Sequence, residues 1–229
     1  MTSARSVVAE LRLAADPSCK LGMARVGISV PRALGVSIPQ LRAMAKRIGR
    51  DHDLAQALWT TNIHEVQILA SMIDEPALVT REQMEDWAAD FASWDVCDQV
   101  CGNLFDATPH AYTVARAWVR RPEEFVRRAG FTLIAERAVR DKAASNDVFL
   151  RFLPVIHRGA TDERNYVKKA VNWALRQIGK RNMTLNAAAI AEAERLLELD
   201  SRNAKWIARD ALRELKSEAV LRRLRAAAR

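Results

Sequence analysis

One helical pattern occurs three times in the second half of the sequence, as FVRRAGFTL from Phe125, YVKKAVNWAL from Tyr166 and WIARDALREL from Trp206. The aligned apolar residues are Val126, Val167 and Ile207, so successive copies lie 41 and 40 residues apart. This spacing is typical of HEAT-like repeats, in which each copy is a helical pair stacked on the next. EVQILASMI from Glu65 has the same pattern but lies 60 residues upstream of the first copy, so the array is irregular there.

Apolar residues recur at helical spacing along almost the whole chain, and only eight Gly and seven Pro interrupt them. The predicted helices cover residues 2–15, 39–49, 51–59, 63–73, 81–91, 94–105, 110–120, 123–141, 146–158, 164–180, 185–199 and 203–226. The expected start and cap residues are Pro39, Thr80 with Gln83, and Thr184 or Asn186. No linker rich in Pro, Gly or Ser divides the chain. We therefore predict one all-α domain over residues 1–229, an α-solenoid of HEAT-like repeats.

Composition excludes several classes of protein. The 229 residues are 49% hydrophobic, which is too apolar for a disordered chain, and three Cys cannot form a disulfide framework. No run of about 18 apolar residues is present to span a membrane. Charged residues interrupt the N-terminus early, so no signal-peptide core is present. We expect a cytoplasmic protein with reduced cysteines and no membrane partner.

Positive charge is concentrated in the second half of a chain whose net charge is +8. From Arg164 to Ala191 there are six basic residues and no acidic one. Two positions after the repeat anchors stand Arg128, Lys169 and Arg209, and equivalent positions of stacked repeats share one face. We predict a concave basic face suited to a polyanion, although matched basic residues also arise by chance in a basic protein.

The helix over residues 164–180 carries a second stripe beside its apolar face. Lys169, Trp173, Arg176 and Lys180 recur at helical spacing on that stripe. In a nucleic-acid site the cations would hold phosphates while the indole packs on a sugar or base. The alternative is that Trp173 only covers a neighbouring repeat.

The segment SWDVCDQVCGNLF from Ser93 places Trp94 and Asp98 four residues apart, on one helix face. A carboxylate beside an aromatic surface can stabilise positive charge in a transition state. Alternatively, its acidic residues are ordinary polar residues near a helix start, where carboxylates are favoured. Cys97 and Cys101 lack the further ligands of a metal site, so we predict neither a metal nor a cofactor.

The segment NYVKKAVNWALRQIGKRN, from Asn165 to Asn182, resembles the AlkD family of bacterial DNA alkylation repair glycosylases. The resemblance extends over roughly residues 20 to 182, through MARVGISVPRALGVSIPQLR, LWTTNIHEVQILASMI, SWDVCDQV and FVRRAGF. It implies a HEAT-like solenoid that grips duplex DNA on a concave basic face. It also implies excision of N3- and N7-alkylated purines without flipping of the damaged base.

The resemblance assigns the essential carboxylate to Asp98, the two sugar-packing tryptophans to Trp94 and Trp173, and the key arginine to Arg128. The residues expected on DNA are Lys168, Lys169, Arg176, Lys180, Arg181 and Arg209. The implied partner is double-stranded DNA with alkylated purines, and we expect a monomer.

Two positions depart from the family pattern. Val26 stands where members often carry an aromatic residue. The loop before Pro39 often presents polar side chains to DNA in the family, and here it presents Ser37 but also Ile38. These departures concern lesion preference. The alternative function is a non-catalytic HEAT-repeat scaffold or nucleic-acid-binding protein, since fold alone implies no chemistry. Such a binder gains nothing from a carboxylate on its basic face, and Asp98 therefore favours the enzyme.

Overall fold

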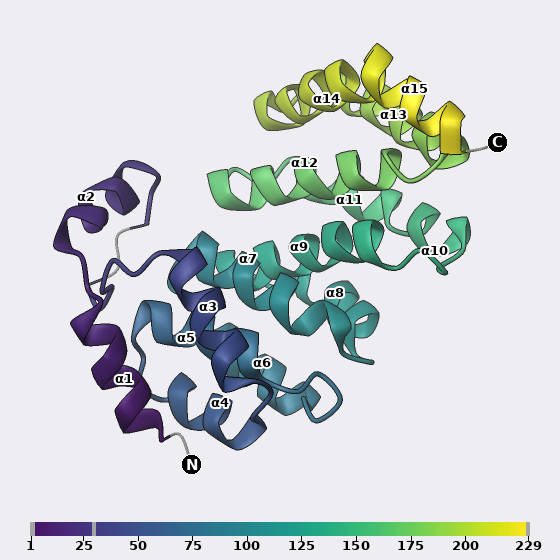
Figure 1. Cartoon of the computed structure of the whole chain (residues 1–229). Helices are drawn as coiled ribbons and strands as arrows, with labels where there is room; N and C mark the ends of the chain where they lie inside the picture. Colours follow the sequence, from purple (N-terminus) through teal and green to yellow (C-terminus); the bar gives the residue numbers. More distant parts are fainter. Residues whose placement is uncertain (1–2, 29–30, 228–229) are drawn as a thin grey trace. The chain divides into compact units, whose positions relative to one another are not determined.

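The computed structural model describes residues 3–28 and 31–227, and these residues form helices and loops with no strand (Figure 1). The predicted all-α class is confirmed. The chain divides into two compact units, Met1–Ala111 and Tyr112–Arg229, which are described in turn. A single domain over residues 1–229 stays a prediction.

The first unit is built around one central helix. Its elements are α1 (Ala4–Leu13), α2 (Pro17–Arg25), α3 (Ile38–Ile48), α4 (His52–Trp59), α5 (His64–Ile73), α6 (Arg81–Ala89), α7 (Trp94–Asn103) and the short 3-10 helix η1 (Phe105–Ala107). Nearly every residue of α5 is buried, and α5 contacts α3, α4 and α7. A helix buried on all sides is a core element, so α5 organises this unit.

An aromatic cluster joins α4 to α6. The Trp59 and Trp87 rings stack with centroids 4.0 Å apart and an interplanar angle of 4°. The Trp59 indole N–H donates to the Asp90 carboxylate over 2.9 Å, and Phe91 and Phe105 pack around the pair. Aromatic pairs stabilise beyond their buried area, so the cluster fixes the outer helices of the unit.

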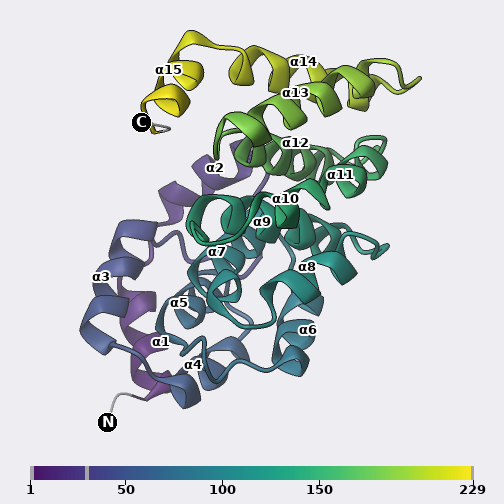
Figure 2. The ribbon, with the colours of Figure 1, turned by 90° about the vertical axis from the view of Figure 1, so that its right-hand side faces the viewer.

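The second unit is a stack of helical pairs. Its elements are α8 (Ala111–Trp118), α9 (Glu124–Arg140), α10 (Asn146–Leu150), α11 (Leu153–Gly159), α12 (Asn165–Gly179), α13 (Met183–Leu197), α14 (Arg202–Leu215) and α15 (Glu218–Ala227). Helix α12 packs against α9 and α14, and both views show it between them (Figures 1 and 2). Helices α11 and α13 pack against α12, and α13 also packs against α14.

The predicted repeat matches this stack. The three anchors Val126, Val167 and Ile207 lie in α9, α12 and α14, and all three are buried. Because the anchors occupy equivalent core positions in the matching helices of successive repeats, residues at a fixed offset from them are also comparable from one repeat to the next.

Two predicted helices were wrong because each is broken in the structure. The helix expected over 146–158 is α10 followed by α11, with Pro154 in the first turn of α11. Proline has no N–H, so Pro154 cannot donate to the carbonyl of Leu150 and continue α10. The helix expected over 203–226 is α14 followed by α15, and the Ser217 hydroxyl accepts from the Val220 N–H near the break. The helical spacing of apolar residues continues through both breaks, so it could not reveal them.

Helix α2 was not predicted. It has no buried residue, so it lacks the apolar stripe by which the other helices were recognised. Its signals are local: Asp16 accepts from the Ser18 N–H over 2.8 Å, and Pro17 occupies the first helical position. The predicted start of the first helix at residue 2 lies outside the described residues.

The cap predictions had mixed outcomes. Thr80 accepts from the Gln83 N–H and caps α6, and Pro39 lies in the first turn of α3, as predicted. The predicted cap of α13 was wrong, because Asn182 accepts from the Leu185 N–H in its place. Asn186 is instead a buried link whose amide donates to the carbonyls of Gly179 and Leu215.

Close packing of α8 on α9 requires glycine at position 130. A Cβ there would lie 2.6 Å from the amide nitrogen of Val119 and 3.0 Å from the carbonyl carbon of Trp118. Backbone atoms cannot move aside as a flexible side chain does, so Gly130→Ala is expected to lower the free energy of unfolding by about 1–3 kcal/mol. Urea unfolding followed by circular dichroism measures this change.

The matched control is Gly22→Ala in α2, where a Cβ meets nothing within 4 Å. That variant is expected to be neutral or more stable by about 0.5–1 kcal/mol, because alanine favours helix. Equal stability of Gly130→Ala and the wild type would contradict the close approach of α8 to α9.

Candidate functional site

The N-terminal turn of α7 carries Trp94, and the structure holds its indole through the backbone. The Trp94 Nε1–H donates to the carbonyl oxygen of Val26 over 3.0 Å, just after α2. The Val26 side chain itself is 59% exposed. Because a carbonyl supplies this bond, the departure from an aromatic residue at position 26 leaves the anchor of Trp94 in place.

The neighbouring Asp95 is committed to structure. It accepts from His64 Nε2 over 2.8 Å and from the Ser93 hydroxyl over 2.7 Å, and His64 is buried in α5. Burial raises the pKa of Asp95, but the hydrogen bond and charge of His64 and the bond from Ser93 outweigh it and hold the pKa below its usual value. Asp95 therefore ties α7 to α5.

Asp98 lies on α7 one turn beyond Trp94 and is half-buried. Residues four apart on a helix are neighbours on one face. The structure thus separates the two carboxylates of the W-D-x-x-D segment: Asp95 bonds to α5, and Asp98 shares the face of Trp94.

A buried glutamate shapes the loop before α3. The Glu65 carboxylate accepts from the backbone N–H groups of Leu34 (2.7 Å) and Gly35 (2.6 Å), and it is 1% exposed. Gly35 has φ +86°, and a Cβ there would collide with the Asp16 carbonyl oxygen. Glu65 is therefore a loop anchor, a function that sequence reasoning missed.

Ser37, expected to face DNA, is used at the start of α3. Its N–H and its hydroxyl both donate to Gln40 Oε1, over 2.9 and 2.6 Å. The side chain of Ile38 is half-buried. The polar group of this loop is thus engaged in capping the helix.

In the second unit, repeat-equivalent cations differ in exposure. Lys169 on α12 and Arg209 on α14 are exposed, and Trp173 on α12 is half-buried. Arg128 is 6% exposed, and its Nη1 donates to the Tyr166 carbonyl over 2.6 Å. Arg128 thus ties α9 to the first turn of α12 and does not extend the exposed row.

Lys168 lies against an exposed aromatic ring. Its Nζ is 4.9 Å from the ring centroid of Trp206, which is 41% exposed at the start of α14. A cation over an indole face is an attractive arrangement. The Lys168 ammonium and the Trp206 ring therefore lie together where α12 packs against α14.

Two other predicted DNA-binding residues are ion-paired inside the stack. Arg176 Nη1 lies 2.8 Å from Glu214 Oε2 and 3.4 Å from Asp210 Oδ2, and Lys180 Nζ lies 2.7 Å from Glu214 Oε1. Asp210 also accepts from the buried Asn172 amide over 2.7 Å. These contacts hold α14 on α12. A phosphate would have to compete with both carboxylates.

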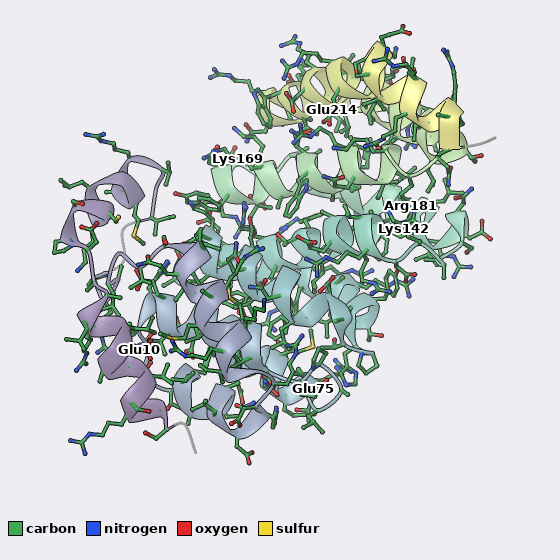
Figure 3. All side chains as sticks on the ribbon, in the orientation of Figure 1. Glu10, Glu75, Lys142, Lys169, Arg181 and Glu214 are labelled. Carbon is green, nitrogen blue, oxygen red and sulfur yellow. The ribbon has the colours of Figure 1, made fainter. Side chains whose placement is uncertain are left out.

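Arg181 is held by the end of α9 and the loop that follows. Its guanidinium donates to the carbonyls of Ala138 (2.6 Å) and Ala144 (3.2 Å), and it lies 4.1 Å from the Phe149 ring centroid. Figure 3 shows Arg181 and Lys169 at opposite ends of α12. The predicted DNA-binding residues therefore do not form one continuous surface on this helix.

Among the described residues, no group of three or more His, Cys, Asp and Glu side chains could hold a metal ion. Within the same ranges, no helix is both long and apolar enough to cross a membrane. All three cysteines are free thiols, with Cys97 and Cys101 buried and Cys19 exposed.

Comparisons with known proteins bear on the whole chain. Residues 7–215 match the family model described as DNA alkylation repair enzyme. The chain is similar to a solved structure described as "A new family of proteins related to the HEAT-like repeat DNA glycosylases with affinity for branched DNA structures". The identity is 20% and the TM-score 0.78, over 93% of this chain and 95% of the other. This similarity confirms the predicted HEAT-like fold.

A designed armadillo repeat protein is also similar, at 16% identity and a TM-score of 0.36, over 78% of this chain and 92% of the designed one. No curated protein matches the chain.

The Asp95 contacts predict a pH-dependent stability. The pKa of Asp95 in the folded state lies below its unfolded value of about 3.9. At acidic pH the unfolded state therefore binds more protons than the folded state, and stability decreases as the pH is lowered. The contribution is fully present above about pH 5 and is lost as the pH falls through the folded pKa. Asp95→Asn should therefore lower the free energy of unfolding near neutral pH, and its difference from the wild type should shrink in acid.

Urea unfolding at a series of pH values measures this difference. Asp86→Asn, an exposed position on α6, is the control and should follow the wild type throughout. A difference between Asp95→Asn and the wild type that is constant with pH would show that Asp95 is not the titrating group.

Proposed function

Since this chain belongs to the AlkD-like family of DNA alkylation repair enzymes, we propose that it is a monofunctional DNA glycosylase. Its substrates are N3- and N7-alkylated purines in duplex DNA, excised without base flipping, and it acts as a monomer without a cofactor. The observation that carries the proposal is Asp98 on the face of Trp94 in α7, within a chain that matches the family over residues 7–215.

The chemistry suits the proposed residues. An alkylated purine is cationic, so when its bond to the sugar C1′ breaks, the electron pair neutralises the base and no general acid is needed. The sugar becomes oxocarbenium-like, and the carboxylate of Asp98 stabilises that positive charge and orients water toward C1′. The π-face of Trp94, on the same helix face as Asp98, attracts the same cation. Water adds its oxygen to C1′ and loses a proton, which leaves an abasic site.

Basic residues of the second unit are the proposed contacts to the phosphates of the DNA backbone. The exposed side chains of Lys169 and Arg209 are available to the DNA backbone, and Lys168 with Trp206 adds a cation beside an aromatic surface. Arg128 is buried and holds the first turn of α12. We propose that its guanidinium also anchors a phosphate of the DNA.

A second candidate function is DNA binding without catalysis. The relative with a TM-score of 0.78 is described as having affinity for branched DNA. The exposed Val26, in place of the aromatic residue frequent in the family, also favours this candidate. The two candidates differ in what they require of Asp98, because a carboxylate repels phosphates and benefits only the enzyme.

The decisive variant is Asp98→Asn. We expect the wild type to release base from duplex DNA carrying one 7-methylguanine, and the variant to release it about 10²-fold more slowly because the amide carries no negative charge. DNA affinity should be unchanged or slightly higher. Single-turnover base release and fluorescence anisotropy measure the two quantities.

The exposed Asp86→Asn serves as the control and should retain full activity. Full activity of Asp98→Asn would refute the assigned carboxylate. Tight DNA binding by the wild type with no release of 7-methylguanine or 3-methyladenine above the spontaneous rate would favour the second candidate.

The exposed cations predict a change in salt dependence. Affinity falls as salt concentration rises, and for each phosphate contact removed the magnitude of the slope of log affinity against log salt concentration should decrease by about 0.9. Lys169→Ala and Arg209→Ala should each show this change, while base release from bound DNA stays near the wild-type rate.

Arg158→Ala is the control, because Arg158 is exposed on α11 and has no proposed phosphate contact. If Lys169→Ala and Arg209→Ala leave the slope unchanged, the proposed phosphate contacts are wrong.

A further inference from the structure

A pocket of about 420 Å³ opens in the second unit. Its walls come from the end of α9 and the following loop, the end of α12 and the start of α13, and helix α15. Figure 3 shows Lys142 close to Arg181, at the opposite end of α12 from Lys169.

Every ionisable group that lines this pocket is a cation. The four are Lys142, Lys180, Arg181 and Arg223, and no Asp or Glu belongs to the described lining. Such a concentration of like charge is unfavourable unless anions offset it, and a pocket lined by one sign of charge attracts the opposite sign.

Neighbouring carboxylates offset only part of this charge. Glu214 pairs with Lys180, and Asp141, next to Lys142, pairs with Arg137 and accepts from Tyr112. Within residues 3–28 and 31–227, neither Lys142 nor Arg223 makes an ion pair with a carboxylate. Two positive charges therefore remain for a ligand.

Backbone contacts hold two of the cations in place. Arg223 Nη2 donates to the Lys180 carbonyl over 3.1 Å. Arg181 donates to the Ala138 and Ala144 carbonyls, and its Nε is buried without a hydrogen-bond partner in the described structure. Burial also lowers the pKa of the Arg181 guanidinium. The neutral carbonyls carry no net negative charge, and Asp141 already pairs with Arg137, so an anion nearby would stabilise the Arg181 guanidinium.

The volume and lining indicate the class of ligand. At about 30 Å³ per water the pocket has room for roughly a dozen waters, and it lies within the range of small-molecule sites. One part of the wall is cationic, and another part is apolar, formed by Ala138, Val139, Ala144, Leu224 and Ala227. Inorganic phosphate uses only the first part. A nucleotide uses both, because its phosphates meet the cations while its sugar or base packs on the apolar wall.

We propose that this pocket binds the phosphate groups of a nucleotide. The nucleotide is either a free nucleoside triphosphate or the 5′-phosphorylated end of a DNA strand, since both present the same chemistry. The inference does not rest on base excision, because the binding is measured with undamaged ligands.

The test measures binding of dATP, and of one short DNA single strand with and without a 5′-phosphate, by isothermal calorimetry. The charge-reversal variant Lys142→Glu/Arg223→Glu should bind dATP or the phosphorylated strand at least about tenfold more weakly than the wild type, because attraction becomes repulsion. The matched control is Arg158→Glu/Arg202→Glu, which makes the same change of net charge at exposed positions outside the pocket. It should bind like the wild type.

Binding of dATP that is lost in the pocket variant identifies free nucleotide as a source. Preference for the phosphorylated strand, with the same loss, identifies the strand end. Equal weakening in both charge-reversal variants, or no binding of either ligand by the wild type, overturns the proposal. If the double variant does not fold, Lys142→Ala, at an exposed position, replaces it and must still weaken binding.

Discussion

Burial of α12 between its two neighbours is the constraint on which the second unit depends. One helical pair cannot bury its apolar face alone, so each repeat is stable only when it stacks on the next. The anchors Val126, Val167 and Ile207 are buried in the matching helices of successive repeats for this reason. Stacking also determines which residues of each repeat are exposed. Lys169 and Arg209 stand at the same offset from their anchors, and both are exposed.

Stacking divides the positive charge of this unit into two kinds. Arg176 and Lys180 are directed at carboxylates of the adjacent helix, where they hold one repeat on the next. Charges that leave water must be paired in this way. Lys169 and Arg209 remain exposed. Net charge therefore overstates the charge available to DNA, and the position of each cation relative to the neighbouring repeat decides its use.

Periodicity and repeat length were enough to predict the helical class and the HEAT-like fold. They did not predict α2, which has no buried residue. They also predicted one helix where α14 and α15 are separate, with the Ser217 hydroxyl accepting from the Val220 N–H at the start of α15. Ion pairs between repeats could not be predicted from the sequence either, because Glu214 lies 34 residues from its partner Lys180. Likewise, sequence places both carboxylates of α7 near its start, and only the contact with His64 shows that Asp95 is structural.

Cleavage of the glycosidic bond of cationic purines is measured by mass spectrometry of the reaction products. Wild-type protein is incubated with duplex DNA treated with a methylating agent, and both the released bases and the strands are analysed. We expect free 3-methyladenine or 7-methylguanine above the spontaneous level, with an equal number of intact abasic sites. Bound DNA with no free base above that level would contradict this expectation.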